Sequence, residues 1–327
     1  MNATQVIDAL REFNLGTVME NEPLSRHTSF RIGGPATVYV QPSCEADLIQ
    51  LLNWVHGNQI PYFILGQGTN LLVSDHGLDA VVISTSRALR DVRVEGLRMT
   101  AGTGVLLTKL AHKAHQASLK GLEFAVSIPG TLGGALVMNA GAHGSEMVQV
   151  VDHIKIWEPG TGLRILNASE TGFAYRQSRF MEHHWIAIEA SMILKSGNSE
   201  EILSTMQHFM NYRKNTQPVG HANAGSVFKN PQPEFAGRLI DGIGAKGWRV
   251  GDAIISPVHA NFIVNGGRAR ACDVLALMRR IRCRVFQRYL ILLHPELRWI
   301  GPGEGGGEGT WENLWYGEGA GLKEPCE

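Results

Sequence analysis

Three side chains that lie far apart in the sequence could together protonate a carbanion beside a carboxylate. Ser226 offers a hydroxyl, within residues 223–231, whose glycine and proline are typical of a turn facing a cleft. Arg176 offers a guanidinium, which can bind a carboxylate with two hydrogen bonds, and Glu296 offers a carboxylate just after an apolar run. A positioned hydroxyl or carboxyl group can act as a general acid. Each of the three also has an ordinary structural alternative: a turn residue, a surface ion pair or a solvated strand end.

Two glycine-rich loops could hold an anion. The first, residues 66–70, follows an apolar run that predicts a short strand, and the second covers residues 127–134. Glycines let backbone N–H groups converge on a phosphate, and two such loops close together suit the diphosphate of a dinucleotide. Residue 71 is leucine, so the first loop lacks the GxGxxG spacing of a Rossmann fold, and no P-loop motif occurs. The structural alternative for each loop is a tight turn packed against a helix.

The elements that must position these residues are both helices and strands. Apolar residues recur at helical spacing in some stretches and form short runs typical of strands in others. The predicted helices cover residues 4–13, 45–57, 105–118, 200–213 and 272–289, and the predicted strands cover residues 61–65, 80–84, 92–94, 97–101, 153–157 and 185–194. The strands follow one another too closely for regular βαβ units. The sequence therefore predicts an α+β fold with small sheets rather than a doubly wound sheet.

Composition and charge exclude several classes of protein. The chain has 327 residues, of which 44% are hydrophobic, and its 30 basic residues equal its 30 acidic residues. It therefore lacks the overall basic field with which proteins bind nucleic acid through the phosphates. No signal peptide and no apolar stretch of about 18 residues is visible, so we expect no membrane span. None of the four cysteines has CxxC or zinc-type spacing, so we expect no metal, a reducing compartment and a cytoplasmic protein.

An ordered set of motifs identifies a family that the chain resembles. In chain order they are Ser29-Phe30-Arg31-Ile32-Gly33-Gly34-Pro35, Gly66-Gln67-Gly68-Thr69-Asn70, Ser127-Ile128-Pro129-Gly130, Met138-Asn139-Ala140-Gly141, Tyr175-Arg176-Gln177-Ser178, the stretch 223–231, His259-Ala260-Asn261-Phe262-Ile263-Val264-Asn265 and Pro295-Glu296-Leu297-Arg298. Together, over about residues 20–301, they resemble the UDP-N-acetylenolpyruvoylglucosamine reductases, the MurB family. The short interval between Tyr175 and Ser226 resembles the compact subtype, which lacks an extra loop that closes over substrate.

The resemblance implies the fold and the division into domains. The family has an FAD-binding domain of the vanillyl-alcohol-oxidase or PCMH type, made of two α+β subdomains, followed by a C-terminal α+β substrate-binding domain. On this chain we expect an N-terminal helix and lead-in over residues 1–30, the FAD-binding domain over 31–197 and the substrate-binding domain over 198–301. Residues 302–327 are a glycine-rich tail that we predict to be disordered.

The resemblance also implies the reaction. The family binds FAD without a covalent bond, takes electrons from NADPH and reduces the enolpyruvyl ether of UDP-N-acetylglucosamine to UDP-N-acetylmuramate, a precursor of peptidoglycan. Hydride passes from flavin N5 to C3 of the enolpyruvyl group, and a serine gives its proton to C2. By matched motif, Arg176, Ser226 and Glu296 are the catalytic residues. We expect a monomer that binds this substrate, without nucleic acid or membrane as partner.

The remaining site residues follow from the same motifs. The predicted cofactor-binding residues are Gly66, Gln67, Gly68, Thr69, Asn70, Ser127, Ile128, Pro129, Gly130, Gly133, Asn139 and Gly141. The predicted substrate-binding residues are Tyr175, Lys214, Lys229, Asn230 and His259. Structural alternatives remain for Lys229 and Asn230, and packing is an alternative for His259.

The chain departs from the family pattern at two places, and two other functions stay open. Many relatives have glutamate in place of His294 and tyrosine in place of His143, which could shift substrate affinity without abolishing the chemistry. The first alternative is an oxidase of the same flavin fold that passes electrons to oxygen and needs no pair of Ser226 and Glu296. The second is a nucleotide-binding regulatory module without catalysis.

Overall fold

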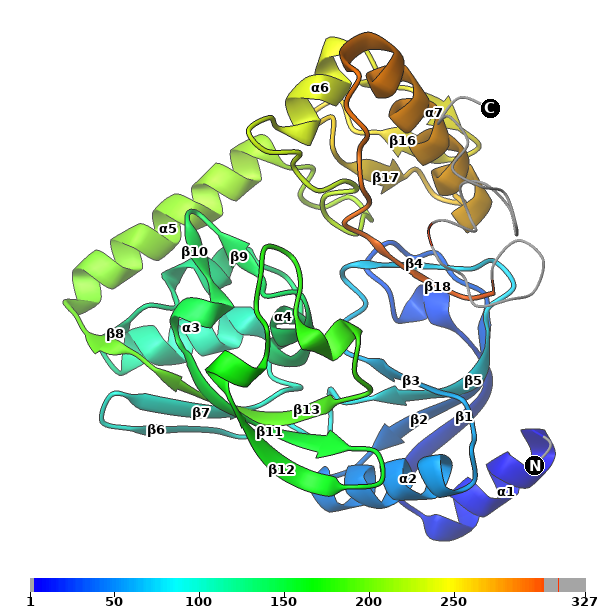
Figure 1. Ribbon diagram of the computed structural model, residues 1–327, viewed down its shortest axis with the longest axis vertical. Helices are drawn as coiled ribbons and strands as arrows, with labels where there is room; N and C mark the ends of the chain where they lie inside the picture. Colours follow the sequence, from blue (N-terminus) through cyan, green and yellow to red (C-terminus); the bar gives the residue numbers. More distant parts are fainter. Residues whose placement is uncertain (1–2, 303–310, 312–327) are drawn as a thin grey trace. The chain divides into compact units, whose positions relative to one another are not determined.

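The protein folds into two compact units, seen in a computed structural model that describes residues 3–302 and Trp311 (Figure 1). The first unit comprises the described residues up to Asn21, together with Thr37–Gln67 and Asp79–Arg213. The second comprises Glu22–Ala36, Gly68–Leu78 and the described residues from Lys214 on. The chain thus passes between the units repeatedly. Apart from Pro302 and Trp311, the predicted tail lies outside the described residues.

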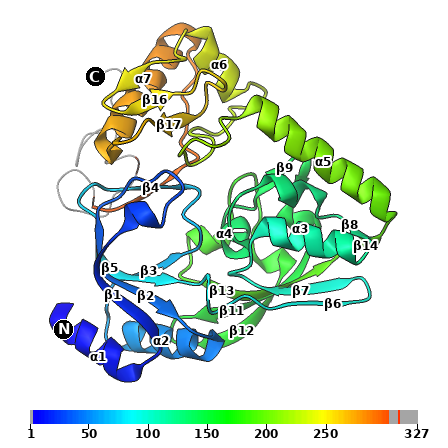
Figure 2. The same cartoon turned by 180° about the vertical axis from the view of Figure 1, so that it is seen from behind.

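A four-stranded sheet in the first unit is covered by two helices (Figures 1 and 2). Its strands, in the order β1-β2-β5-β3, are β1 (Gly16–Pro23), β2 (Pro35–Pro42), β5 (Leu78–Ser84) and β3 (Tyr62–Leu65), the last two parallel. The helices are α1 (Ala3–Phe13) and α2 (Glu45–Gly57), both close to their predicted bounds. Leu48, Leu51, Leu52 and Val55 recur at helical spacing, so α2 buries one apolar face in the core beneath the sheet.

The first unit also holds a five-stranded antiparallel sheet in the order β12-β11-β13-β7-β6. The strands are β6 (Val92–Glu95), β7 (Arg98–Gly102), β11 (Val151–Glu158), β12 (Gly162–Asn167) and β13 (Ile186–Ile193). The helices α3 (Leu107–Gln116), α4 (Leu132–Val137) and α5 (Ser199–Thr216) contribute to the same apolar core as these strands. Two short pairs complete the unit: β8 (Leu119–Lys120) with β14 (Lys195–Ser196), and β9 (Gly141–Ala142) with β10 (Ser145–Glu146).

The second unit packs two helices with a three-stranded sheet. The sheet has the order β15-β16-β17, with β15 (Arg249–Val250), β16 (Ala253–Ile255) and β17 (Ile263–Asn265), and the helices are α6 (Ala236–Gly242) and α7 (Ala271–Tyr289). Val274, Leu277, Met278, Ile281 and Val285 form the buried stripe of α7. Arg282 of the same helix is also buried, and its guanidinium donates to the carbonyl of Leu293 (3.2 Å).

One parallel pair in the second unit joins distant parts of the chain. β4 (Leu71–Val73) follows the first glycine loop, and β18 (Arg298–Ile300) follows Glu296. Because Arg298 pairs with Leu71, the residues just before each strand lie side by side. The short 3-10 helices of the chain are Leu24–Arg26, Glu123–Ser127, Met147–Gln149, Ala168–Glu170 and Arg179–Met181.

The described residues contain no helix that is long and apolar enough to cross a membrane, and no group of three or more His, Cys, Asp or Glu side chains placed to hold a metal. Cys44 and Cys272 carry free thiols, whereas Cys283 is disulfide-bonded. A reducing compartment would favour a free thiol at Cys283.

Candidate active site

Ser226 and Glu296 lie on two segments that pair as short antiparallel strands. The Glu296 N–H donates to the carbonyl of Val227, and the Lys229 N–H donates to the carbonyl of His294, both at 2.8 Å. This register sets Val227 opposite Glu296 and places Ser226 one residue from that pair, although Ser226 and Glu296 lie 70 positions apart in the sequence. Two of the three predicted catalytic residues are therefore brought together by the second unit.

Asn261 fixes the segment that carries Ser226. Its side chain, 3% exposed, accepts from the N–H of Phe228 (3.0 Å) and donates to the carbonyl of Phe228 (2.8 Å). Its backbone carbonyl accepts from the N–H of Val227 (2.9 Å). Phe228 itself is fully buried, so the segment is held by both packing and hydrogen bonds. These contacts leave little freedom for the backbone on either side of Ser226.

The Ser226 hydroxyl is half-buried and makes no hydrogen bond to any group in the described part of the chain. The ammonium of Lys229, three residues further along, likewise has no partner in the described part of the chain. Asn230 accepts a hydrogen bond from the N–H of Ala236 through its side-chain oxygen (3.0 Å), which leaves its amide donors for another partner. Lys214 is exposed. A hydroxyl and a cation without protein partners, held on a rigid segment, are available to a ligand.

The first glycine loop is divided between the two units. Gly66 and Gln67 belong to the first unit, whereas residues 68–70 belong to the second. The Asn70 side chain donates to the backbone carbonyl of Glu296 (3.1 Å), and Asn70 accepts from the N–H of Arg298 through its own carbonyl (2.9 Å). Gly68 has a φ of +59°, and a Cβ there would lie 2.3 Å from the carbonyl oxygen of His27. Only glycine fits this turn, which keeps Asn70 beside Glu296.

His259 lies beside the same segment but is engaged in packing. Its Nδ1 accepts from the N–H of Asn261 (3.2 Å), and its ring meets Phe262 edge to face at 4.9 Å. Burial, followed by repulsion from Lys246, lowers the pKa of His259 below its ordinary value, so the ring is neutral at pH 7. This geometry gives His259 a role in holding Asn261, which in turn holds the Ser226 segment.

Arg176 sits at the tip of a tight turn in the first unit. Ala174 and Gln177 exchange backbone hydrogen bonds of 3.0 and 3.1 Å, which leaves Tyr175 and Arg176 as the two turn residues. Arg176 has a φ of +54°, a conformation that costs a residue with a side chain about 1–3 kcal/mol. Its guanidinium donates to the carbonyl of Gly141 (2.9 Å) and lies 5.2 Å from the ring centre of Tyr175. Such strain persists only where the surroundings impose it.

Buried polar side chains impose the turn. Ser178, 1% exposed, donates to the carbonyl of Val137 (2.7 Å). Asn139, fully buried, donates to the carboxylate of Glu146 (2.7 Å) and to the carbonyl of Ala174 (3.1 Å), and it accepts from the N–H of Val148 (3.0 Å). The Asn139 side chain is thus engaged in hydrogen bonds within the protein. This predicted cofactor residue can therefore contribute to cofactor binding only by holding its loop in place.

The second glycine loop adjoins a cation that sequence analysis missed. Arg213 donates to the carbonyl of Ser127 (2.7 Å), its Nε is buried without a hydrogen-bond partner, and no carboxylate of the described residues pairs with it. Burial lowers the pKa of the Arg213 guanidinium. Gly66 faces this loop, because a Cβ there would lie 2.5 Å from Oγ1 of Thr131. A buried, unpartnered Nε on a half-buried cation beside two glycine loops fits the anionic groups of FAD.

The sequence does contain a signal for Arg213. On α5 it continues the face formed by Ile202, Met206 and Phe209, at helical spacing, and the first two of these are buried. A charged residue in line with an apolar stripe indicates a cation directed toward the interior. The neighbouring Lys214, which was predicted to bind substrate, lies off that face and is exposed.

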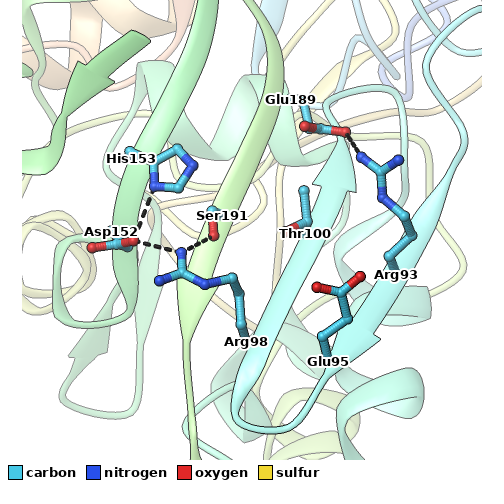
Figure 3. Close-up of a pocket in the computed structure, with 8 residues that line it drawn as sticks. All are labelled: Arg93, Glu95, Arg98, Thr100, Asp152, His153, Glu189 and Ser191. Atoms are coloured by element: carbon cyan, nitrogen blue, oxygen red, sulfur yellow. Dashed lines mark hydrogen bonds and ion pairs between the residues drawn. The ribbon is translucent and has the colours of Figure 1, made fainter.

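A second cluster of charges lies on the five-stranded sheet and is paired within itself (Figure 3). It lines an open hollow of about 450 Å³ and includes Arg93, Glu95, Arg98, Thr100, Asp152, His153, Glu189 and Ser191. Arg98 donates to Asp152 (2.6 Å) and Ser191 (2.7 Å), and Arg93 donates to Glu189 (2.5 Å). None of the predicted site residues lines this hollow, so we assign it a structural role.

Comparisons with known proteins identify the family. Residues 217–300 match the model for the C-terminal domain of UDP-N-acetylenolpyruvoylglucosamine reductase, and residues 36–164 match that of an FAD binding domain. The chain is 43% identical over 297 residues to the UDP-N-acetylenolpyruvoylglucosamine reductase of Caldanaerobacter subterraneus subsp. tengcongensis, covering 90% of this chain and 98% of that relative. The chain belongs to the UDP-N-acetylenolpyruvoylglucosamine reductase family.

The chain is also similar to other members of the reductase family. The Bacillus subtilis enzyme is 40% identical over 300 residues, covering 91% of this chain and 98% of the relative. The crystal structure of the reductase from Thermus caldophilus superposes with a TM-score of 0.72 at 36% identity, covering 87% of this chain and 98% of that one. The predicted α+β fold, with an FAD-binding domain and the C-terminal domain of this family, is confirmed.

Proposed function

We propose that this protein reduces UDP-N-acetylglucosamine enolpyruvate to UDP-N-acetylmuramate, with non-covalent FAD as cofactor and NADPH as electron donor. The family membership supports a flavin-dependent reductase of peptidoglycan synthesis. The proposal for the site rests mainly on the backbone pairing of the segment of Ser226, whose hydroxyl is unengaged among the described residues, with the segment of Glu296. An oxidase of the same flavin fold, which passes electrons to oxygen, would not need Ser226 and Glu296.

The residues of the second unit supply the proton. When bound and reduced by NADPH, FAD would supply a hydride to C3 of the enolpyruvyl group, which would leave carbanion character at C2. Ser226 donates its proton to C2, since its hydroxyl has no acceptor among the described residues. Glu296 acts beside it, either orienting a proton source or serving as a neutral acid near the developing negative charge. Lys229 supplies positive charge on the same rigid segment, which stabilises anionic substrate groups.

Arg176 binds the substrate carboxylate in this proposal. Its guanidinium donates to the carbonyl of Gly141 and presents a planar set of N–H donors. A guanidinium can form a bidentate contact with a carboxylate, which lysine forms less well. As charge builds on the substrate carboxylate during reduction, a guanidinium already fixed by a strained turn stabilises it without rearranging. Tyr175, Lys214, Asn230 and His259 complete the proposed substrate site, the last by supporting Asn261.

The two glycine loops and Arg213 would hold FAD. Backbone N–H groups suit its diphosphate, and Arg213 supplies the cation that an anionic cofactor needs in a buried place. The proposed cofactor residues are those of loop 66–70 and of residues 127–130, with Gly133, Gly141 and the loop of Asn139. We further propose that the protein works as a monomer in the cytoplasm, without nucleic acid.

The Ser226→Ala variant tests the role of the hydroxyl. We expect the variant to bind FAD and to be reduced by NADPH at the wild-type rate, but to lose reoxidation by the enolpyruvyl substrate by about 100-fold or more. Ser204→Ala, on the exposed side of α5, is the matched control and should behave as wild type. Both half-reactions are followed by the visible absorbance of the flavin without oxygen. Reoxidation of Ser226→Ala at the wild-type rate would remove Ser226 from the mechanism.

A further inference from the structure

The β9–β10 hairpin that holds Arg176 ends in an unusual residue, His143. The hairpin loop is His143-Gly144, with φ values of +54° and +81°, as the two-residue turn of type I′ requires. Asparagine is the common residue at the first position of such a turn. Histidine tolerates this conformation better than most residues, but its ring needs another explanation.

The ring of His143 packs against α5. It stacks face to face on Phe209, with ring centres 3.9 Å apart and planes 5° from parallel. It also meets Tyr212 edge to face, at 5.5 Å and 80°. Phe209 packs on the core of the first unit, whereas Tyr212 is exposed, so the stack ties the tip of the hairpin to a helix that is itself anchored. Although His143 is exposed overall, partial burial of its ring, then repulsion from His208, lowers its pKa, so the stacked ring is neutral at pH 7.

The other end of the hairpin contacts the Arg176 turn. The carbonyl of Gly141 accepts from the Arg176 guanidinium (2.9 Å). The carboxylate of Glu146 accepts from Asn139, which also donates to the carbonyl of Ala174 at the start of the turn. The hairpin has only two ladder pairs, which is too few to fix its own position. Its base is held by the bond from Met147 N–H to the carbonyl of Ala140 (3.0 Å), and its tip by the stack of His143.

We propose that His143 is a positioning residue: its ring clamps the β9–β10 hairpin onto Phe209 and Tyr212 of α5, and the hairpin in turn holds the Arg176 guanidinium through the carbonyl of Gly141. This rests on the proposed function of Arg176 in binding the substrate carboxylate. The clamp explains why a flat ring stands at a turn position where a small polar residue would fold equally well.

Two variants separate the ring from the backbone conformation. His143→Asn removes the ring and keeps a residue suited to positive φ, whereas His143→Tyr keeps a ring of similar shape. We expect His143→Asn to lower kcat/KM for the enolpyruvyl substrate about threefold to tenfold. This factor corresponds to the free energy that a typical aromatic pair contributes. His143→Tyr should stay within about twofold of wild type, and both should be reduced by NADPH at the wild-type rate.

A double-mutant cycle tests whether the effect passes through Arg176. The Arg176→Lys variant has no guanidinium at this position. Adding His143→Asn to that variant should therefore lower kcat/KM little further. An equal loss in both backgrounds, or wild-type kcat/KM in His143→Asn, would overturn the proposal.

Hydrogen exchange tests the clamp independently of activity. In His143→Asn the amides of Ala174 and Gln177 should exchange faster than in wild type and in His143→Tyr, because the turn is less firmly held. Unchanged exchange at these amides would refute the clamp even if the enzyme acts on another substrate. If instead wild-type protein reduces no enolpyruvyl ether while the exchange changes as expected, the proposed function fails and the clamp stands.

Discussion

Replacing Asn139 should destabilise the first unit and loosen the Arg176 turn together. The fully buried side chain makes a charged hydrogen bond to Glu146 and neutral ones to Ala174 and Val148. A charged bond contributes about 1.5–3 kcal/mol and each neutral bond about 0.5–1.5 kcal/mol. Glu146 is only half-buried and Val148 is exposed, so water can form hydrogen bonds with the groups that lose Asn139 as their partner and so reduces the destabilisation. We expect Asn139→Gly to lower the free energy of unfolding by about 3 kcal/mol.

The backbone conformation separates two variants at this position. Asn139 has a φ of +41°, which glycine adopts freely and alanine does not. Asn139→Ala should therefore be roughly 1 kcal/mol less stable than Asn139→Gly, although alanine ordinarily stabilises a folded chain relative to glycine. Asn211→Ala, at an exposed position of α5, is the control and should stay within about 0.5 kcal/mol of wild type.

The assay is urea unfolding of the FAD-free protein, with kcat/KM for the enolpyruvyl substrate measured on the FAD-loaded protein. Both variants should lose kcat/KM, since Asn139 holds the carbonyl of Ala174 at the start of the turn. The hydrogen-bond network does not impose the turn if the free energy of unfolding of Asn139→Ala lies within about 1 kcal/mol of the wild-type value. The same conclusion follows if Asn139→Ala is more stable than Asn139→Gly.

Three further predictions concern charged groups. Arg213→Gln should weaken FAD binding at least about tenfold, by fluorescence titration, whereas the exposed control Arg179→Gln should not. Arg98 and His153 lower the pKa of Asp152 from 3.8, so Asp152→Asn should be less stable than wild type at pH 7, with the difference vanishing as pH falls through the folded-state pKa. Burial lowers the pKa of His259 from 6.5, so wild-type stability should fall below pH 6.5, and less so in His259→Gln. Equal melting profiles across pH would contradict either prediction.

Local patterns in the sequence predicted the long helices well. The apolar stripes of α2 and α7 follow helical spacing, so their bounds were predicted to within a residue or two. β1 and β2 were not predicted, because β1 is mostly polar and β2 buries three consecutive residues, Val38, Tyr39 and Val40, without alternation.

The arrangement of the site depends on contacts that no local pattern contains. The pairing of the Ser226 segment with Glu296 joins residues far apart in the chain, and its register is set by Asn261 and by β4 with β18. The positive φ of Arg176 is imposed by Asn139 and the β9–β10 hairpin rather than by the turn sequence itself. The motifs identified these residues individually, but only the fold shows what holds each one.

Whether the protein reduces the enolpyruvyl ether with electrons from NADPH is tested by recording the flavin absorbance of the wild-type protein without oxygen. NADPH is added first to the FAD-loaded protein, and UDP-N-acetylglucosamine enolpyruvate is added second. We predict bleaching by NADPH and full recovery on adding the enolpyruvyl ether, with one equivalent of UDP-N-acetylmuramate formed. Bleaching that only oxygen reverses would contradict it and would identify an oxidase of the same flavin fold.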